Sequence, residues 1–182
     1  IYEGQFKEGN ADGNGTEYFD NGQIKYQGEW KNFLKDGHGT RYDEKTGNKA
    51  YVGQFKEGKA HGNGTQYSDN GKIIYQGEWE MGVQDGYGTE YFDNAFGQME
   101  NVGLLKIYQP PLTYYTGKVF EGLFRLEEQD GNGTLYFGDG QIKYRGARKK
   151  GLRHGHGTEY FRNGQIEYQG GWTDGVADGH GT

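Results

Sequence analysis

Short segments of this chain alternate between apolar and polar residues, and residues 23–30 show the pattern most plainly. Three apolar residues and a glycine fall on one face of an extended segment: Ile24, Tyr26, Gly28 and Trp30. Polar residues fall on the other face: Lys25, Gln27 and Glu29. A period of two is typical of a half-buried strand. A glycine between two rings weakens such a strand but lets another ring or the backbone approach closely.

A hairpin connection and a return strand are predicted to follow, at residues 31–37 and 39–42. Most copies of the connection carry a glycine, where we expect a positive φ: Gly9, Gly58, Gly82, Gly151 and Gly175. An Asp or His near its end is expected to bond to nearby backbone N–H groups and hold the turn. These residues are Asp12, Asp36, His61, Asp85, Asp130, His154 and Asp178.

A second turn is predicted where the return strand ends. Asn-Gly between two alternating segments favours a two-residue hairpin turn of type I′. The pair, or its Asp-Gly equivalent, recurs at Asn21-Gly22, Asn70-Gly71, Asp139-Gly140 and Asn163-Gly164. Because every connection is short, the strands should form an antiparallel meander that requires no helix.

The whole pattern recurs along the chain. Its leading aromatic residues are Tyr2, Tyr26, Tyr51, Tyr75, Phe120, Tyr144 and Tyr168, which are 24, 25, 24, 45, 24 and 24 residues apart. A fixed period of this size indicates a repeat array. We therefore predict an all-β fold, an elongated single-layer antiparallel meander of tandem β-hairpins that forms a twisted ribbon. Residues 1–182 should form one array, with a degenerate repeat near residue 101 in the long gap.

The composition indicates which residues stabilise such an array. Gly supplies 36 of 182 residues, aromatic residues make up 16%, and Cys is absent. Since aliphatic residues are scarce, burial should come from aromatic rings laid over backbone. No segment reaches the ~18 apolar residues of a membrane-spanning helix. The chain starts at Ile1 and stops within a repeat at Thr182, so we expect it to be a piece of a longer polypeptide.

The repeated motif resembles the MORN repeat family. The motif reads Tyr-x-Gly-x-Trp-x-x-Gly-x-x-(Asp/His)-Gly-x-Gly-Thr-x-Tyr, and residues 75–91 match nearly throughout. The resemblance implies a twisted all-β meander that serves as a scaffold, dimerisation or partner-binding module. It implies settings such as cilia and flagella, membrane junctions, parasite cytoskeletons, and positions beside lipid-kinase or methyltransferase domains. The Asn-Gly-Gln-Ile-x-Tyr-x-Gly segment also resembles bacterial repeats described as antitoxin-like.

Three residues depart from this motif. Phe33 and Glu127 replace the usual glycine after the aromatic residue, and Arg148 replaces the Trp or Phe itself. The long gap also departs from it, because residues 92–119 look like an eroded repeat with Pro110 and Pro111 between its strands. Drift in a tolerant connection explains this segment, but it could also form a platform for a partner. The platform residues would be Tyr108, Tyr114 and Tyr115.

The repeated rings allow two interpretations that can both hold. They can pack on each other as the core, or they can line an open groove that takes a partner helix or an extended peptide. The candidate groove residues are Tyr26, Trp30, Tyr42, Tyr51, Phe55, Tyr67, Tyr75, Trp79, Tyr91, Tyr168 and Trp172. The open ends of the sheet could also pair with another molecule end to end.

Charge is distributed unevenly. The net charge is −6, yet residues 140–158 hold six basic residues and no acid. These are Lys143, Arg145, Arg148, Lys149, Lys150 and Arg153. They either form a solvated face or bind an anionic partner, such as an acidic protein segment, a microtubule surface or a phosphoinositide. The overall acidity argues against nucleic acid and disfavours adsorption to anionic lipid.

Catalytic and metal sites find little support in the sequence. His154 and His156 are two residues apart, but His154 fills a recurring turn position, and a zinc site needs converging ligands. We expect no catalytic residue, metal or cofactor. The predicted function is a non-enzymatic protein-interaction scaffold, cytoplasmic and part of a cytoskeletal or ciliary assembly. Two alternatives remain: a membrane-proximal phosphoinositide-binding tether, or a regulatory segment of a lipid-kinase or methyltransferase-type enzyme.

Overall fold

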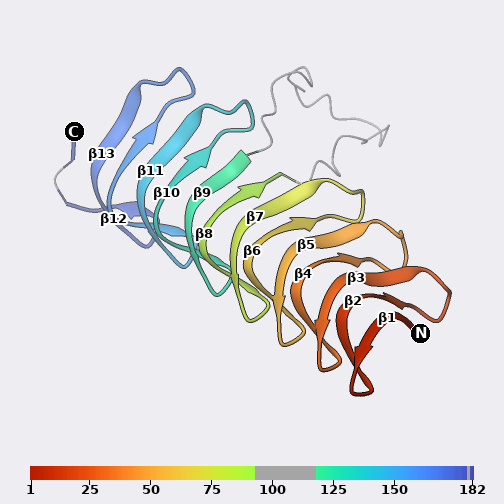
Figure 1. Ribbon diagram of the computed structural model, residues 1–182. Coiled ribbons are helices and arrows are strands. Elements are labelled where there is room, and N and C mark those ends of the chain that lie inside the picture. Colours follow the sequence, from red (N-terminus) through yellow and green to blue (C-terminus); the bar gives the residue numbers. More distant parts are fainter. Residues whose placement is uncertain (93–117, 180) are drawn as a thin grey trace, which may run out of the picture. The chain divides into compact units, whose positions relative to one another are not determined.

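The computed structural model describes residues 1–92, 118–179 and 181–182, and these residues contain fourteen β-strands and no helix (Figure 1). The chain divides into two compact units, residues 1–86 and 87–182, and each is described by itself. The eroded repeat near residue 101, Pro110, Pro111 and the platform residues Tyr108, Tyr114 and Tyr115 lie outside the described residues. The prediction of one continuous array stays a prediction.

Unit 1 contains seven complete strands and the start of an eighth. They are β1 (Tyr2–Lys7), β2 (Asn10–Tyr18), β3 (Ile24–Lys31), β4 (Leu34–Tyr42), β5 (Lys49–Lys56), β6 (Lys59–Tyr67), β7 (Ile73–Glu80) and β8 (Val83–Tyr91), which runs on into unit 2. Unit 2 adds β9 (Lys118–Arg125), β10 (Glu128–Tyr136), β11 (Ile142–Lys149), β12 (Leu152–Tyr160), β13 (Ile166–Thr173) and β14 (Val176–Ala177).

Consecutive strands pair antiparallel within each unit, from β1 to β7 and from β9 to β14. The hairpins lie side by side in chain order (Figure 1). The predicted all-β antiparallel meander of tandem hairpins is therefore confirmed. Short connections explain this order, because a two-residue loop can join only strands that are antiparallel neighbours.

The first kind of turn is tighter than predicted. The return strand β4 begins at Leu34, so the Asp36-Gly37 pair lies inside the strand and not in the loop. Only two residues separate β3 from β4, and both have positive φ, 48° at Asn32 and 66° at Phe33. Such a pair defines a type I′ turn. The predicted positive φ values are confirmed at Gly9, Gly58, Gly82, Gly151 and Gly175.

The second kind of turn is not of type I′, and that prediction was wrong. In this turn of the first repeat Gly22 has a positive φ, 84°, whereas Asn21 does not. Gly22 N donates to Phe19 O at 3.0 Å, and Phe19 N donates to Gln23 O at 2.9 Å. This is a type I turn closed by a glycine bulge. The Asn21 side chain accepts a bond from Gln23 N at 2.9 Å and so stabilises the extended loop.

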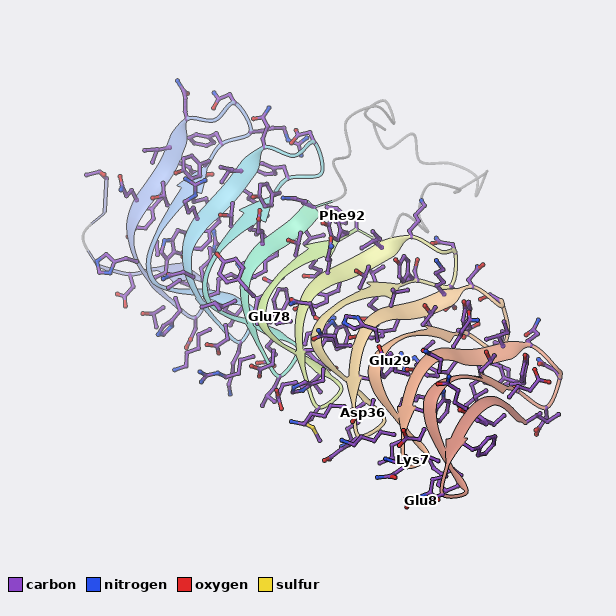
Figure 2. All side chains as sticks on the ribbon, in the orientation of Figure 1. Lys7, Glu8, Glu29, Asp36, Glu78 and Phe92 are labelled. Carbon is purple, nitrogen blue, oxygen red and sulfur yellow. The ribbon has the colours of Figure 1, made fainter. Side chains whose placement is uncertain are left out.

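At three of the seven positions the Asp or His acts differently from the prediction. Asp36 lies near the tight-turn end of its hairpin (Figure 2), and its Oδ2 accepts a bond from Glu57 N of the next tight turn at 3.3 Å. His61 and His154 likewise face an acid of the next tight turn, with Nδ1 3.3 Å from Glu80 and 3.6 Å from Asp174. These side chains link successive hairpins instead of holding their own turn.

The core of each unit consists of rings that lie on backbone. Gly28 and Gly39 are direct cross-strand partners, and the Tyr26 ring covers both. A Cβ added to Gly39 would stand 2.2 Å from Tyr26 Oη and 2.4 Å from its Cζ. The hydroxyl donates to Glu29 O at 3.0 Å, which satisfies it although the side chain is 0% exposed. The paired glycines are thus required for the ring to reach its position.

Candidate functional site

An aromatic ladder runs through unit 1. Tyr2, Tyr26 and Tyr51 each meet two rings edge-on, that of the Trp or Phe in their own repeat and that of the next repeat. Tyr26, for example, lies 5.2 Å from Trp30 and 5.1 Å from Phe55 between ring centroids. The same contacts connect Phe6, Tyr2, Trp30, Tyr26, Phe55, Tyr51, Trp79 and Tyr75 in an unbroken series. Edge-to-face geometry is favourable because a positive ring edge meets a negative ring face.

Most of the predicted groove residues belong to this ladder or to its counterpart in unit 2. Buried residues are Tyr26, Trp30, Tyr51, Phe55, Tyr75, Trp79 and Trp172. Partly exposed residues are Tyr42, Tyr67, Tyr91 and Tyr168. Tyr26, Tyr51 and Tyr75 are therefore covered by their own chain, and their role in a partner groove stays a prediction. The four partly exposed tyrosines offer more ring surface to solvent.

Backbone carbonyls satisfy the polar atoms of the ladder. Trp30 Nε1 donates to Gly15 O at 3.2 Å, and Trp79 and Trp172 make the equivalent bond to Gly64 and Gly157. Burial raises the pKa of the Tyr26 and Tyr75 hydroxyls and raises that of Tyr51 to about 12. A ring that is both buried and hydrogen-bonded stabilises the hairpin without leaving an unsatisfied donor.

Arg148 occupies a Trp position of the ladder in unit 2. Its guanidinium carbon lies 5.7 Å from the Phe120 ring centroid, so a cation replaces the edge of an aromatic ring. Nη2 donates to the Gly151 carbonyl. Nε is buried and has no hydrogen-bond partner among the described residues. Burial lowers the pKa of Arg148, yet an arginine remains charged at neutral pH.

A cavity of about 310 Å³ opens beside this guanidinium. It is lined by Leu135, Lys143, Tyr144, Arg148, Gly151, Leu152, Arg153, Glu159 and Gly175. Its charged residues are three cations and one acid. Arg153 forms an ion pair with Glu159, donates to Gly175 O at 3.1 Å and lies 4.1 Å above the Trp172 ring centroid. The cavity therefore has a fixed cationic wall, because packing and hydrogen bonds hold both arginines.

The structure separates the six predicted basic residues. Lys143, Arg148 and Arg153 line the cavity. Arg145 follows Tyr144 in β11 and so points to the opposite face, where it shares a hollow with Glu121. Lys149 and Lys150 are exposed at the tight turn between β11 and β12. The sequence thus located the basic segment, but it did not show which three residues converge.

Sequence reasoning missed Leu135 and Glu159, which complete the cavity. Leu135 pairs with Phe120 and Tyr144, just as Glu17 pairs with Tyr2 and Tyr26 in the first repeat. An alignment of the repeats would have shown that Leu135 stands at the position of Glu17 in the first repeat. The sequence singled out Phe33 as a departure from the motif but not as a site, and it did not single out Leu34; both are exposed at the tip of the β3–β4 hairpin.

The described residues offer no group of three or more His, Cys, Asp or Glu side chains that could hold a metal ion. No helix long and apolar enough to cross a membrane occurs in the part of the chain that the structure describes.

The comparison with known families gives a specific result. The MORN repeat model matches seven segments: residues 2–24, 26–45, 51–73, 75–94, 120–142, 144–166 and 168–182. None of the curated proteins compared with the chain matches it. MORN repeats generally take part in protein–protein or membrane and lipid interactions, and they are typically non-enzymatic interaction modules. The matched segments cover well over half of the residues, and the chain therefore belongs to the MORN repeat family.

Proposed function

We propose that this chain is a non-enzymatic scaffold that binds other proteins and serves as a structural part of a cytoplasmic cytoskeletal or ciliary assembly. The observation that carries the proposal is the tip of the β3–β4 hairpin. Phe33 and Leu34 are 57% and 48% exposed there, as direct neighbours on one hairpin tip. Exposed apolar residues that lie together are typical of an interaction site.

Phe33 is unfavourable for the isolated chain in two ways. It exposes a large ring, and it holds φ at 66°, where five other repeats have glycine. A left-handed conformation costs an L-residue about 1–2 kcal/mol. Residues that keep such strain occur preferentially at binding sites. The fold does not need this ring, because the backbone N of Phe33 makes the inter-hairpin bond, to Ala11 O at 3.0 Å. A partner surface that takes up the ring explains its presence.

Phe33→Gly tests the proposal. The variant should unfold at a higher urea concentration than the parent, by about 1 kcal/mol, because the strain is removed. It should lose proteins that the parent captures from an extract of ciliated cells, measured by quantitative mass spectrometry. Glu127→Gly is the matched control, because Glu127 has a φ of 68° at the equivalent turn position. That variant should gain stability but keep its partners. Unchanged capture by Phe33→Gly would refute the proposed role of this tip.

A membrane-proximal tether is the second candidate function, favoured by exposed Lys149 and Lys150 at the β11–β12 tip. Basic residues near a surface attract anionic headgroups by about 1 kcal/mol each. Co-sedimentation with phosphoinositide vesicles tests this role. Salt-sensitive binding that Lys149→Glu and Lys150→Glu abolish would favour the tether, whereas absence of binding would exclude it.

A further inference from the structure

We propose that the cavity lined by Lys143, Arg148 and Arg153 binds a carboxylate side chain from an acidic segment of a partner protein. The proposal rests on the protein-binding scaffold proposed above, and it names the chemistry of one contact. Two equivalent positions of the chain, Glu17 in the first repeat and Leu135 in unit 2, carry the evidence.

The first repeat shows what fills this position when the chain supplies its own acid. Glu17 lies between two lysines, 2.8 Å from Lys25 Nζ and 3.1 Å from Lys35 Nζ. Burial opposes the ionised form of Glu17, yet the bonds from Lys25 and Lys35 hold its pKa below the usual value. Lys35 also lies 5.0 Å above the Tyr26 ring centroid. The lysines, the carboxylate and the ring therefore form a complete site.

The equivalent site in unit 2 also has two cations, Lys143 and Arg153, but it lacks the carboxylate between them. Lys143 corresponds to Lys25, and each lies over a Phe of the preceding turn, at 5.8 Å from Phe137 and 5.9 Å from Phe19. Arg153 corresponds to Lys35, because it pairs with Arg148 as Lys35 pairs with Trp30. Leu135 stands where Glu17 stands, so this position has lost its bridging acid.

The remaining acids do not restore the bridge. Glu159 pairs with Arg153, and Lys143 and Arg148 form no ion pair within the described residues. Glu90 acts on the Arg148 charge only at longer range, because its carboxylate accepts a bond from Gln129 at 2.7 Å. Counting the charges of the cavity wall leaves an excess of two positive charges, with the buried Nε of Arg148 still lacking an acceptor.

A carboxylate on a peptide suits this cavity better than a lipid headgroup. A volume of about 310 Å³ accommodates a single side chain, and a carboxylate fills the corresponding position in the first repeat. An arginine held in place binds a carboxylate through short charge-assisted bonds. A bilayer must approach over a wide area, where the residues outside 140–158, with a net charge of −12, repel anionic lipid. An extended peptide needs to approach only at the cavity.

Binding of a short labelled peptide tests the inference. The probe is capped Glu-Gly-Glu-Gly-Glu, its neutral counterpart has Gln in place of Glu, and fluorescence anisotropy measures both against the full chain. We expect the Glu peptide alone to bind. Leu135→Glu should weaken that binding about tenfold or more, since it supplies the acid that Glu17 supplies in the first repeat. Arg148→Trp, which restores the ladder residue, should also abolish binding while the protein stays folded.

Lys149→Glu combined with Lys150→Glu is the control for general attraction. It changes the net charge more than Leu135→Glu does, but both residues lie outside the cavity. It should weaken peptide binding by less than about threefold, because screening limits the effect of exposed charges. An equal loss in this control and in Leu135→Glu would overturn the proposal.

Three further outcomes would overturn it: unchanged binding by Leu135→Glu, equal binding of the Gln peptide, or no binding of the Glu peptide. Vesicles containing phosphatidylinositol bisphosphate form the second arm, and Leu135-sensitive binding to them without peptide binding would assign the cavity to lipid. Failure of the scaffold is distinguishable from failure of the cavity. If Leu135→Glu captures the parent's partners while Phe33→Gly loses them, the scaffold stands and the cavity proposal fails.

Discussion

At the scale of single residues, the glycine pairs under the rings decide whether the core can form, because they make room for the tyrosine rings. Tyr26 is fully buried only because Gly28 and Gly39 leave its ring free to lie on two strands. The same arrangement places Tyr51 over Gly53 and Gly64, and Tyr144 over Gly146 and Gly157. The sequence showed the period of these glycines, and the structure adds that each pair faces across two strands.

Gly39→Ala should destabilise the protein by about 2–3 kcal/mol, because its Cβ would overlap the Tyr26 ring and no side chain can yield without breaking the ladder. Urea unfolding measures the loss. Gln27→Ala is the control, because Gln27 is exposed on the other face of the adjacent strand and its truncation should change stability by less than about 0.5 kcal/mol. Equal midpoints for Gly39→Ala and the parent would contradict this account of the core.

At the scale of elements, two different turns alternate, and the ladder connects the hairpins they form. The tight turn bonds to the backbone of the preceding hairpin, as Gly58 N does to Lys35 O at 2.9 Å. The ladder is interrupted where Arg148 replaces a ring, between Phe120 and the Tyr144–Trp172 contact. In β11 a cation therefore replaces aromatic packing, and a gain in stability does not explain this replacement.

Arg148→Trp should raise stability by about 1–2 kcal/mol. The new ring would meet Phe120 and Tyr144 edge-on, and its Nε1 would reach the Gly133 carbonyl, by analogy with Trp30 and Gly15. Thermal unfolding followed by circular dichroism measures the gain. Arg148→Met keeps the length of the side chain without the indole, so it serves as the control and should gain less. A lower midpoint for Arg148→Trp than for the parent would show that the ladder geometry is not transferable to this repeat.

At the scale of the whole molecule, stability is distributed over many buried tyrosines, and this makes it sensitive to high pH. Burial raises the pKa of Tyr26, Tyr51, Tyr75 and Tyr144 above the value near 10 expected in the unfolded chain. The folded state therefore binds their protons more tightly. The stabilisation is complete below about pH 10 and falls as pH rises through the folded pKa values, about 12 for Tyr51.

We expect the urea midpoint to be constant between neutral pH and about pH 9 and to fall steeply above about pH 10. The tyrosinate absorbance of the four buried tyrosines, obtained as the difference between the parent and each Tyr→Phe variant, should rise together with unfolding. Tyr144→Phe should reduce the steepness in proportion to one removed group, although it also loses the bond from its hydroxyl to Ala147 O at 2.9 Å. Ionisation of Tyr26, Tyr51, Tyr75 or Tyr144 well before unfolding would show that these hydroxyls are accessible and would contradict their burial.

The sequence by itself determined the repeat, the strand pairs, the family and the positive φ of five turn glycines, because these depend on local spacing and on the steric freedom of glycine. It also located the basic segment and the departures at Phe33, Glu127 and Arg148. It predicted too long a loop for the first turn, since Asn32–Phe33 contains no Asn-Gly signal, and it assigned the wrong type to the second, where Gly22 closes a type I turn as a bulge.

Only the tertiary structure decided which of those residues meet. Lys143 and Arg153 converge on Leu135 because pairing shifts at a bulge between Leu135 and Tyr136, which leaves Lys143 as an extra residue in its strand. A one-residue shift in register reverses the face of a side chain, and no local pattern fixes it without the partner strand. The cavity therefore depends on the register of strand pairing. The aromatic ladder, which Arg148 interrupts, could be predicted from the repeat spacing of the sequence.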